Sequence, residues 1–563
     1  MDLFNSIITK KPKKSRFVLN HEYCATMDFG FIYPFLCLDC VPGDRFRFGN
    51  EVLVNTATMS SPVYGRIDAR VDYFFVPYRL LWDDWRDFIT GGEDGQSAPT
   101  FPMLELNGEL IHVGSIFDYM GIPPTTQFGV QQATDGDPVG EFSALPFRAY
   151  NFIWNEFYRN QNYQDEVPFR TSSDTTDELA DYSLLSRCWR PDYYTSMLPT
   201  PQRGADVQIP VTGEGSLYAD LPVVNQPLNE AGDNVTDIKG RGSDSGNDQV
   251  YHGENNFIRN SSVGSGFVAT QQAPTDDNPY NLQFDVSKHS RAQGNINADI
   301  TGLGVSINDL RRANAVQVWL ERNMRAGARY VEQILSHFGV RVPDYRLDRP
   351  EHIGGFTKPI QVNQMQQLSQ TTEDSYLGEL GGRGFMYGQG STRKYRVEEH
   401  GVILGLINLQ PRAMYSQGLP RYFSKKDKFD FYFPEFANLG EQEVKMKEIY
   451  KPFDVVENPD ETIGYLPRYA EYKYIPSTIH GGFLTQGLEH WTMSRFFRSK
   501  PYLDENSVKV TPDSDDINRI WNQTNTPSES GDTNGYGHFY VRLANYVNGK
   551  RPMPRYGTPK LIG

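Results

Sequence analysis

The stretch that decides the fold is RIDARVDYFF, residues 66–75. Its apolar side chains alternate with charged ones, and the apolar set is Ile67, Ala69, Val71, Tyr73 and Phe75. A period of two predicts a β-strand with one face against a core and the other against charge. The run GVILGLINL, residues 401–409, has half the ~18 apolar residues that a membrane span needs, so it is read as a buried strand.

Turns and helices are predicted between the strands. Val41-Pro42-Gly43-Asp44 predicts a turn, because Pro presets φ and Gly supplies a positive φ. Helical spacing predicts short helices over 80–89, 115–120 and 145–160, and one long helix over 307–338 that Gly339 closes. Further along, the aromatic segments 429–434 and 469–475 are read as strands.

The composition favours an all-β chain with many turns. Aromatic residues make up 13% of the 563 residues, and there are 50 Gly and 36 Pro. Four cysteines are too few for a disulfide framework, which predicts folding in a reducing compartment. The first residues place apolar side chains before basic ones, the reverse of a signal peptide.

The net charge of −15 restricts the partners of the chain. At long range an acidic protein is repelled from nucleic acid and from anionic membranes, so any contact with nucleic acid must be local, within ~10 Å. Residues 1–20 carry a net charge of +4 and read as an extended basic arm. We expect its cations to contact DNA, namely Lys10, Lys11, Lys13, Lys14 and Arg16.

The segment 205–300 differs from the rest of the chain. It is rich in Gly, Asn, Asp, Ser and Thr, and its net charge is −8. A structureless loop of this length inside a compact domain is improbable, which favours a projecting surface module over a linker.

The motifs of enzymes and metal sites are incomplete. His21-Glu22-Tyr23-Cys24-Ala25 lacks the second His of a zinc-protease helix, and Cys37-Leu38-Asp39-Cys40 has no second Cys/His pair. The glycine-rich segments 302–304 and 381–384 lack the context of a phosphate-binding loop. The arginines of the long helix favour ion pairs or subunit contacts over DNA. We therefore predict no catalytic residue, no metal and no cofactor, and hence no enzyme.

Several segments, in order, resemble the major capsid protein of the microviruses, the small tailless icosahedral phages with circular single-stranded DNA. The gokushovirus branch gives the closest resemblance. Tyr78 stands where the family pattern has Asn, and Thr200 where it has an aromatic residue. The segments that carry the resemblance are VPGD at 41–44, YFFVPYRLLWDDW at 73–85, LPFRAYNFIWNE at 145–156, PDYYTSMLPTPQRG at 191–204, GARY at 327–330, SHFGV at 336–340, RPE at 349–351, EHG at 399–401, residues 421–440, and YAEYK at 469–473.

The resemblance implies an all-β fold, an eight-stranded antiparallel viral jelly roll with long insertions that contain helices and loops. Residues 21–204 would form its first part, and 301–563 the remainder with a C-terminal extension. The segment 205–300 lies where the family has a threefold surface protrusion. Its candidate contacts with a receptor or around the threefold axis are Asp233, Asp237, Asp244, Asp248 and Glu254.

The implied function is structural. Many identical copies would close by symmetry into a T=1 icosahedral shell around the genome. The resemblance also implies a small basic DNA-binding peptide, an internal scaffolding protein, a DNA pilot protein and a host cell-surface receptor as partners, with no membrane. It places the chain in the virion, assembled in the cytoplasm of a bacterial host. The alternative from another class is a secreted β-sandwich carbohydrate-active enzyme or lectin. A bacterial surface adhesin is a third possibility, but it predicts a secretion signal, which the first residues do not resemble.

Overall fold

The computed structural model describes residues 12–125, 140–173, 177–207, 307–366, 380–450, 458–511, 514–521 and 537–556, with short strands between 217 and 298. The chain divides into two compact units. One unit comprises Met1–Asp206 with Gln317–Gly563, and the other comprises Val207–Val316. The five acidic candidates between Asp233 and Glu254 lie outside the described residues.

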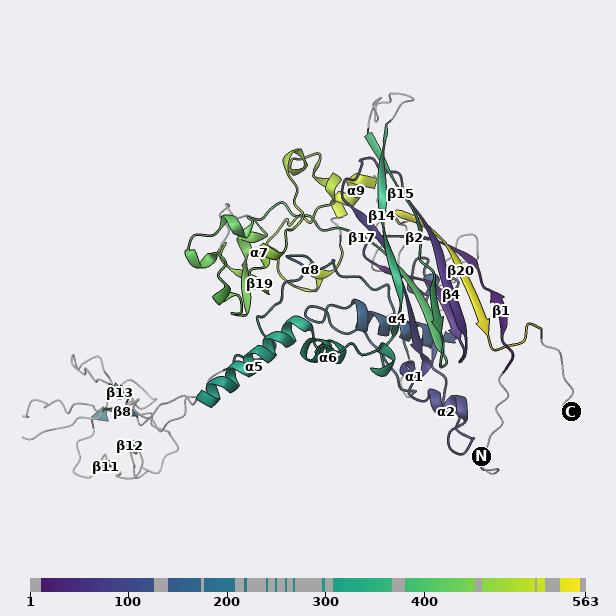
Figure 1. The fold of residues 1–563 in the computed structure, drawn as a ribbon, viewed down its shortest axis with the longest axis horizontal. Helices are drawn as coiled ribbons and strands as arrows, with labels where there is room; N and C mark the ends of the chain where they lie inside the picture. The colour runs from purple at the N-terminus through teal and green to yellow at the C-terminus, as the bar shows by residue number, and fades with distance from the viewer. Residues whose placement is uncertain are drawn as a thin grey trace, which may run out of the picture. The chain divides into compact units, whose positions relative to one another are not determined.

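Strands dominate the larger unit (Figure 1). In chain order the strands are β1 (Ser15–Val18), β2 (His21–Met27), β3 (Ile32–Cys40), β4 (Arg45–Thr56), β5 (Ile67–Pro77), β6 (Met103–Glu105), β7 (Glu141–Ser143), β8 (Leu217–Ala219), β9 (Lys239–Gly240), β10 (Gln249–Val250), β11 (Arg259–Asn260), β12 (Phe267–Val268), β13 (Ile296–Ala298), β14 (Glu351–Gln366), β15 (Leu380–Gln389), β16 (Arg393–Arg396), β17 (Gly401–Pro411), β18 (Glu441–Lys445), β19 (Thr462–Pro467) and β20 (Phe539–Arg551). Within the smaller unit, β8 pairs with β13, β9 with β10, and β11 with β12.

The order of the long strands is that of a jelly roll. One half of the sheet runs β2-β20-β4-β15 and the other β3-β17-β5-β14, and all neighbours are antiparallel. The pairing of β14 with β15 joins the halves along one edge, while β1 and β16 extend the first half. Successive strands alternate between the halves except at β5 and β14. The predicted eight-stranded antiparallel jelly roll is therefore confirmed.

The core lies between the two halves. The odd positions of β5 from Ile67 to Phe75 meet Phe46, Phe48 and Val54 of β4 there. The predicted alternation in β5 is thus confirmed. Its charged face is not open to solvent, however, because Asp68 and Asp72 are both buried.

A second apolar cluster covers the outer face of the β3-β17-β5-β14 half. Phe74 of β5 and Leu404 of β17 pack there with the helical insertion that follows β7. Residues along the whole of β17 are therefore buried, as predicted for GVILGLINL, since the strand has a core on both faces.

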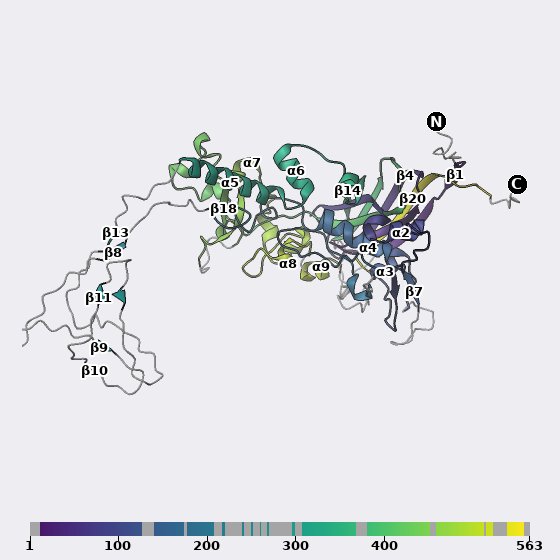
Figure 2. The ribbon, with the colours of Figure 1, turned by 90° about the horizontal axis from the view of Figure 1, so that it is seen from below.

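Helices lie in the insertions between strands (Figure 2). They are α1 (Tyr78–Leu81), α2 (Trp85–Thr90), α3 (Ile116–Met120), α4 (Leu145–Ile153), α5 (Ile307–Ala326), α6 (Tyr330–Phe338), α7 (Ala470–Lys473), α8 (Glu505–Val508) and α9 (Ser514–Trp521). The helix predicted over 115–120 is confirmed as α3, which the Ser115 side chain caps and Gly121 ends at a φ of 100°. No helix in the described part of the chain is long and apolar enough to cross a membrane.

The prediction of a single helix over 307–338 is wrong, because this segment forms two helices, α5 and α6. Gly327 has a φ of 107°, and a Cβ at this position would overlap the carboxylate of Glu332. That carboxylate accepts the backbone N–H of Arg329, which caps α6. The chain therefore ends one helix and begins another within three residues.

Other boundaries also differ from the predictions. The helix predicted over 80–89 is divided into α1 and α2, and α4 continues as a π-helical turn, Trp154–Tyr158. The strands predicted at 429–434 and 469–475 are wrong. The first region forms 3-10 turns in which the Asp430 carboxylate accepts the backbone N–H groups of Lys426 and Asp427, and the second contains α7.

Candidate nucleic-acid interface

Cations line up across four neighbouring strands at one end of the jelly roll. In the sheet register Arg396 of β16 lies opposite Arg45 of β4, Arg45 opposite Lys550 of β20, and Lys550 opposite Arg16 of β1. One position pair further along, Lys394 lies opposite Arg47. We call these six residues the basic row. Strands lie ~4.8 Å apart, so four charges cross ~14 Å of sheet.

The alternation of β4 points the basic row away from the core. Phe46 and Phe48 are buried in the core, and Arg45 and Arg47, which alternate with them along the strand, are exposed. The same parity in β20 buries Val547 and exposes Lys550. The apolar residues of the jelly roll therefore hold the cations on its outer face.

Within the part of the chain that the structure describes, most of the basic row has no anionic partner. Among the described residues, Arg396 alone of the six is within ion-pair distance of a carboxylate, that of Glu398 at 3.9 Å. The neighbouring arginines behave differently, since Arg551 pairs with buried Asp44 at 3.1 Å and Arg542 with Glu22 at 2.6 Å. Like charges placed opposite each other destabilise a sheet, so this row favours a surface that binds a polyanion.

The predicted arm residues meet this surface in part. Arg16 belongs to the basic row, and the Lys14 ammonium donates to the carbonyl oxygen of Gly43 in the turn before β4. Lys13 is exposed, and Lys10 and Lys11 lie outside the described residues.

The extended arm was predicted to include residues 15–18, but these form β1. They pair with β20 in register from Ser15 opposite Arg551 to Val18 opposite Asn548. Deleting residues 1–16 would therefore remove part of a strand, and a truncation that spares the sheet stops before Ser15.

Aromatic side chains continue the same outer face beyond the cations. Tyr540 and Tyr546 of β20 are exposed on the parity of Lys550, and Phe385 and Tyr387 of β15 lie on the same side. The charge of Glu51 raises the pKa of Tyr546. Exposed aromatic rings beside cations are typical of surfaces on which single-stranded bases stack.

Sequence analysis missed five of the six residues in the basic row. The alternation Arg45-Phe46-Arg47-Phe48 could have suggested two outward arginines. Lys394, Arg396 and Lys550 join them through pairings between strands far apart in the chain, and no local pattern shows such pairings.

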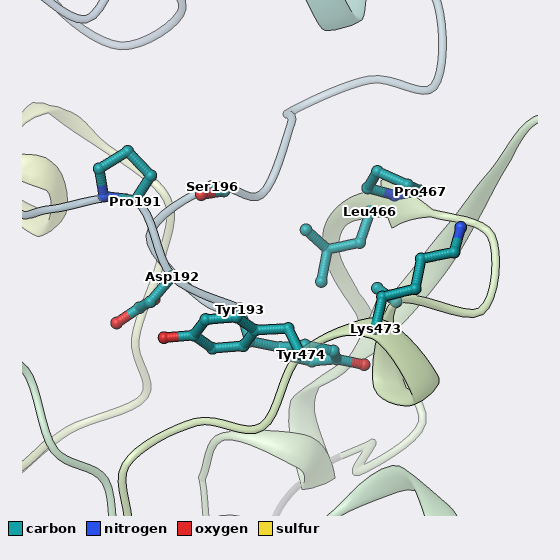
Figure 3. A pocket seen from close by; sticks show the side chains of 9 residues that line it. Pro191, Asp192, Tyr193, Ser196, Leu466, Pro467, Lys473 and Tyr474 are labelled. Carbon is teal, nitrogen blue, oxygen red and sulfur yellow. The ribbon is translucent and has the colours of Figure 1, made fainter.

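A separate hollow of about 240 Å³ lies between the segment after Trp189 and the end of β19. Figure 3 shows Asp192, Tyr193 and Lys473 among its lining side chains. The Asp192 carboxylate accepts the Tyr415 hydroxyl at 2.9 Å and the backbone N–H groups of Tyr194 and Thr195, so it holds the local fold. Glycoside hydrolysis uses a pair of carboxylates, and Asp192 is the single one among the lining residues that the structure describes.

Metal-ligand clusters were also sought. Over the described ranges, no group of three or more His, Cys, Asp or Glu side chains is arranged to hold a metal ion. Cys37 and Cys40, the pair with CxxC spacing, are free thiols of β3.

Comparisons with known proteins give one consistent result. Residues 5–561 match the family model described as "Capsid protein (F protein)". Capsid protein VP1 of Chlamydia phage 1 is 32% identical over 610 aligned residues, covering 99% of this chain and 97% of the relative. Capsid protein VP1 of Bdellovibrio phage phiMH2K is 31% identical, covering 100% and 98%. Capsid protein VP1 of Spiroplasma virus 4 is 27% identical, covering 97% and 95%.

Proposed function

The chain belongs to the family of phage capsid proteins (F protein), and from this premise we propose that it builds a T=1 icosahedral shell around a circular single-stranded DNA genome. Capsid proteins act as many copies in the virion, and their role is structural. The observation that carries the proposal is the basic row on the outer face of a jelly roll whose chain is otherwise acidic.

In this proposal the basic row faces the genome. At short range the basic row supplies positive charge that no described carboxylate compensates, at Arg45, Arg47 and Lys550. The arm adds four positive charges to the same surface, those of Lys10, Lys11, Lys13 and Lys14. A chain with a net charge of −15 cannot neutralise a genome by itself. A small basic DNA-binding peptide is therefore a proposed partner, with an internal scaffolding protein and a DNA pilot protein, and assembly takes place in the bacterial cytoplasm.

A second surface fits contacts between copies of the chain. We call it the aromatic patch: Tyr422, Phe423, Phe429, Phe431, Tyr432, Phe433, Tyr472 and Ile475, all exposed. The Lys425 ammonium lies over the rings of Phe431 and Tyr472, at 5.3 and 4.0 Å from their centroids, and the ring of Tyr432 lies 6.4 Å from that of Tyr472. Tyr422 and Phe423, close to Lys425 in the chain, have ring centroids 4.3 Å apart. Contiguous exposed aromatic groups are typical of protein interfaces.

Replacing Phe423 with Asp tests the aromatic patch. The Phe423 side chain is 66% exposed, so the subunit is expected to fold normally, whereas the buried charge is expected to reduce particle yield at least tenfold. Sedimentation of assembled particles measures the effect. The matched control Phe423→Tyr should assemble normally, and normal assembly of the Asp variant would exclude this patch as a contact.

The segment 205–300 is proposed to form the surface protrusion that meets the host. Replacing it with a short Gly/Ser linker should leave the larger unit folded and abolish adsorption of particles to host cells. A second variant changes only Asp233, Asp237, Asp244, Asp248 and Glu254 to the amides, and it should weaken adsorption if these residues bind the receptor. Wild-type adsorption of the linker variant would contradict the proposal, and loss of all soluble subunit would show that the segment belongs to a core.

A further inference from the structure

A charged cluster lies on the covered face of β5, on the far side of the core from the basic row. Asp68 is 1% exposed, and its carboxylate meets three arginines: Arg66 at 2.8 Å, Arg412 at 3.0 Å and Arg190 at 3.1 Å. Three positive guanidinium groups therefore surround the single negative charge of Asp68.

Asp72 lies four residues further along the same face of β5, and its carboxylate also has several partners. Its carboxylate accepts from Arg70 at 2.7 Å, from His352 at 3.1 Å and from the hydroxyl of Tyr158 at 3.1 Å. Burial acts to raise the pKa of Asp72, but the hydrogen bonds from His352 and Arg70 and the positive charge of Arg70 hold it below its usual value. The carboxylate is thus ionised and compensated at neutral pH.

Arg187 adds a further cation to the cluster. Its side chain is partly buried, and the guanidinium donates to the Asn408 side-chain oxygen at 2.8 Å and lies over the Tyr158 ring, 5.3 Å from its centroid. Among the described residues, no carboxylate lies within ion-pair distance of it. Burial lowers the pKa of Arg187, and the charges of Arg70 and Arg190 lower it further, although Tyr158 and the charge of Asp72 oppose this.

The cluster therefore holds five arginines, with Arg66 and Arg412 as the outer pair, around two aspartates. A guanidinium that has lost part of its hydration and lies among other cations is stabilised by an added anion. Planar guanidinium groups match the oxygens of phosphate in two-point hydrogen bonds.

A cavity opens beside the unpaired guanidinium. It measures about 390 Å³, and Arg70, Arg187, Arg190, Trp189 and Thr357 line it. This volume falls in the range of small-molecule sites, ~300–1,000 Å³. Thr357 of β14 lies directly opposite Arg70 of β5 in the sheet register. Its exposed side chain is therefore on the same face of the sheet as Arg70.

We propose that this cavity binds a phosphate group, with Arg187 as its anchor and Arg70 and Arg190 as flanking donors. The site is separate from the basic row because the core of the jelly roll lies between the two faces. The same chemistry would accept a free phosphate compound or one phosphodiester of a nucleic acid strand.

Isothermal titration of the purified chain with inorganic phosphate, against chloride at equal ionic strength, tests the site. We expect saturable binding to the wild type and at least tenfold weaker binding to Arg187→Gln. Since Arg187 also holds Asn408, a second variant, Thr357→Glu, places a competing carboxylate at an exposed lining position and should abolish binding in a folded protein. Arg86→Gln, an exposed arginine of α2, is the matched control and should bind normally.

A single-stranded oligonucleotide distinguishes the two sources of phosphate. Competition between oligonucleotide and phosphate would assign the cavity to a phosphodiester, whereas independent binding would assign it to a free phosphate compound. Absence of saturable phosphate binding by the wild type, or equal binding by Thr357→Glu, would overturn the proposal. Neither result would bear on particle assembly.

Discussion

Particles that carry Arg45→Glu and Arg47→Glu are expected to assemble but to lose most of their DNA. Both side chains are exposed and have no carboxylate partner among the described residues, so the core does not depend on them. Each phosphate contact contributes ~0.7 to the slope of log affinity against log salt for single strands. Loss of two contacts should lower that slope by about 1.4 and reduce subunit affinity for a single-stranded oligonucleotide by roughly tenfold or more at ~0.15 M salt.

Fluorescence anisotropy of a labelled oligonucleotide across a salt series measures both quantities. The control variant, Arg86→Glu with Arg346→Glu, makes the same change in net charge at exposed arginines outside the basic row. If the two variants lose DNA equally, total charge controls packaging and the basic row has no special part in it.

The largest loss of stability is expected from Arg148→Ala. Arg148 lies in α4 beneath β17 and is 1% exposed, and its Nε donates to the Asp177 carboxylate at 3.0 Å while Nη1 donates to the Leu81 carbonyl at 3.0 Å. Removal of the guanidinium leaves the Asp177 carboxylate charged and buried. Of the side-chain donors described for it, the Tyr182 hydroxyl at 2.7 Å then remains. Breaking such a pair costs about 3–5 kcal/mol of the free energy of unfolding.

Urea denaturation of the subunit measures this cost. The double variant Arg148→Met with Asp177→Leu should recover much of the lost stability, because an apolar pair replaces the buried charges. Arg542→Ala breaks an exposed surface pair with Glu22 and should leave the midpoint nearly unchanged. Equal effects of Arg148→Ala and Arg542→Ala would refute the account of α4.

Much of the fold could be predicted from local patterns. Alternation in residues 66–75, the continuous run at 401–409 and the turn at Pro42-Gly43 follow from the geometry of single elements, and each is confirmed. The jelly roll itself came from the resemblance to a family, because no local pattern states which strands pair.

What the sequence could not provide depends on partners distant in the chain. Arg16 lies opposite Lys550 because β1 pairs with β20, a strand more than five hundred residues further along the chain. The break at Gly327 depends on where the Glu332 carboxylate lies, and the aromatic segments near Phe431 form turns because Asp430 binds the backbone. The acidic residues from Asp233 to Glu254 remain a prediction.

Cryo-electron microscopy of nuclease-treated particles shows directly which face of the jelly roll meets the genome. We expect an icosahedral shell of this chain with nucleic-acid density on its inner side, against Arg45, Arg47 and Lys550. A shell in which these cations face the exterior, or a purified chain that remains a 64.2 kDa monomer under conditions of assembly, would contradict this expectation.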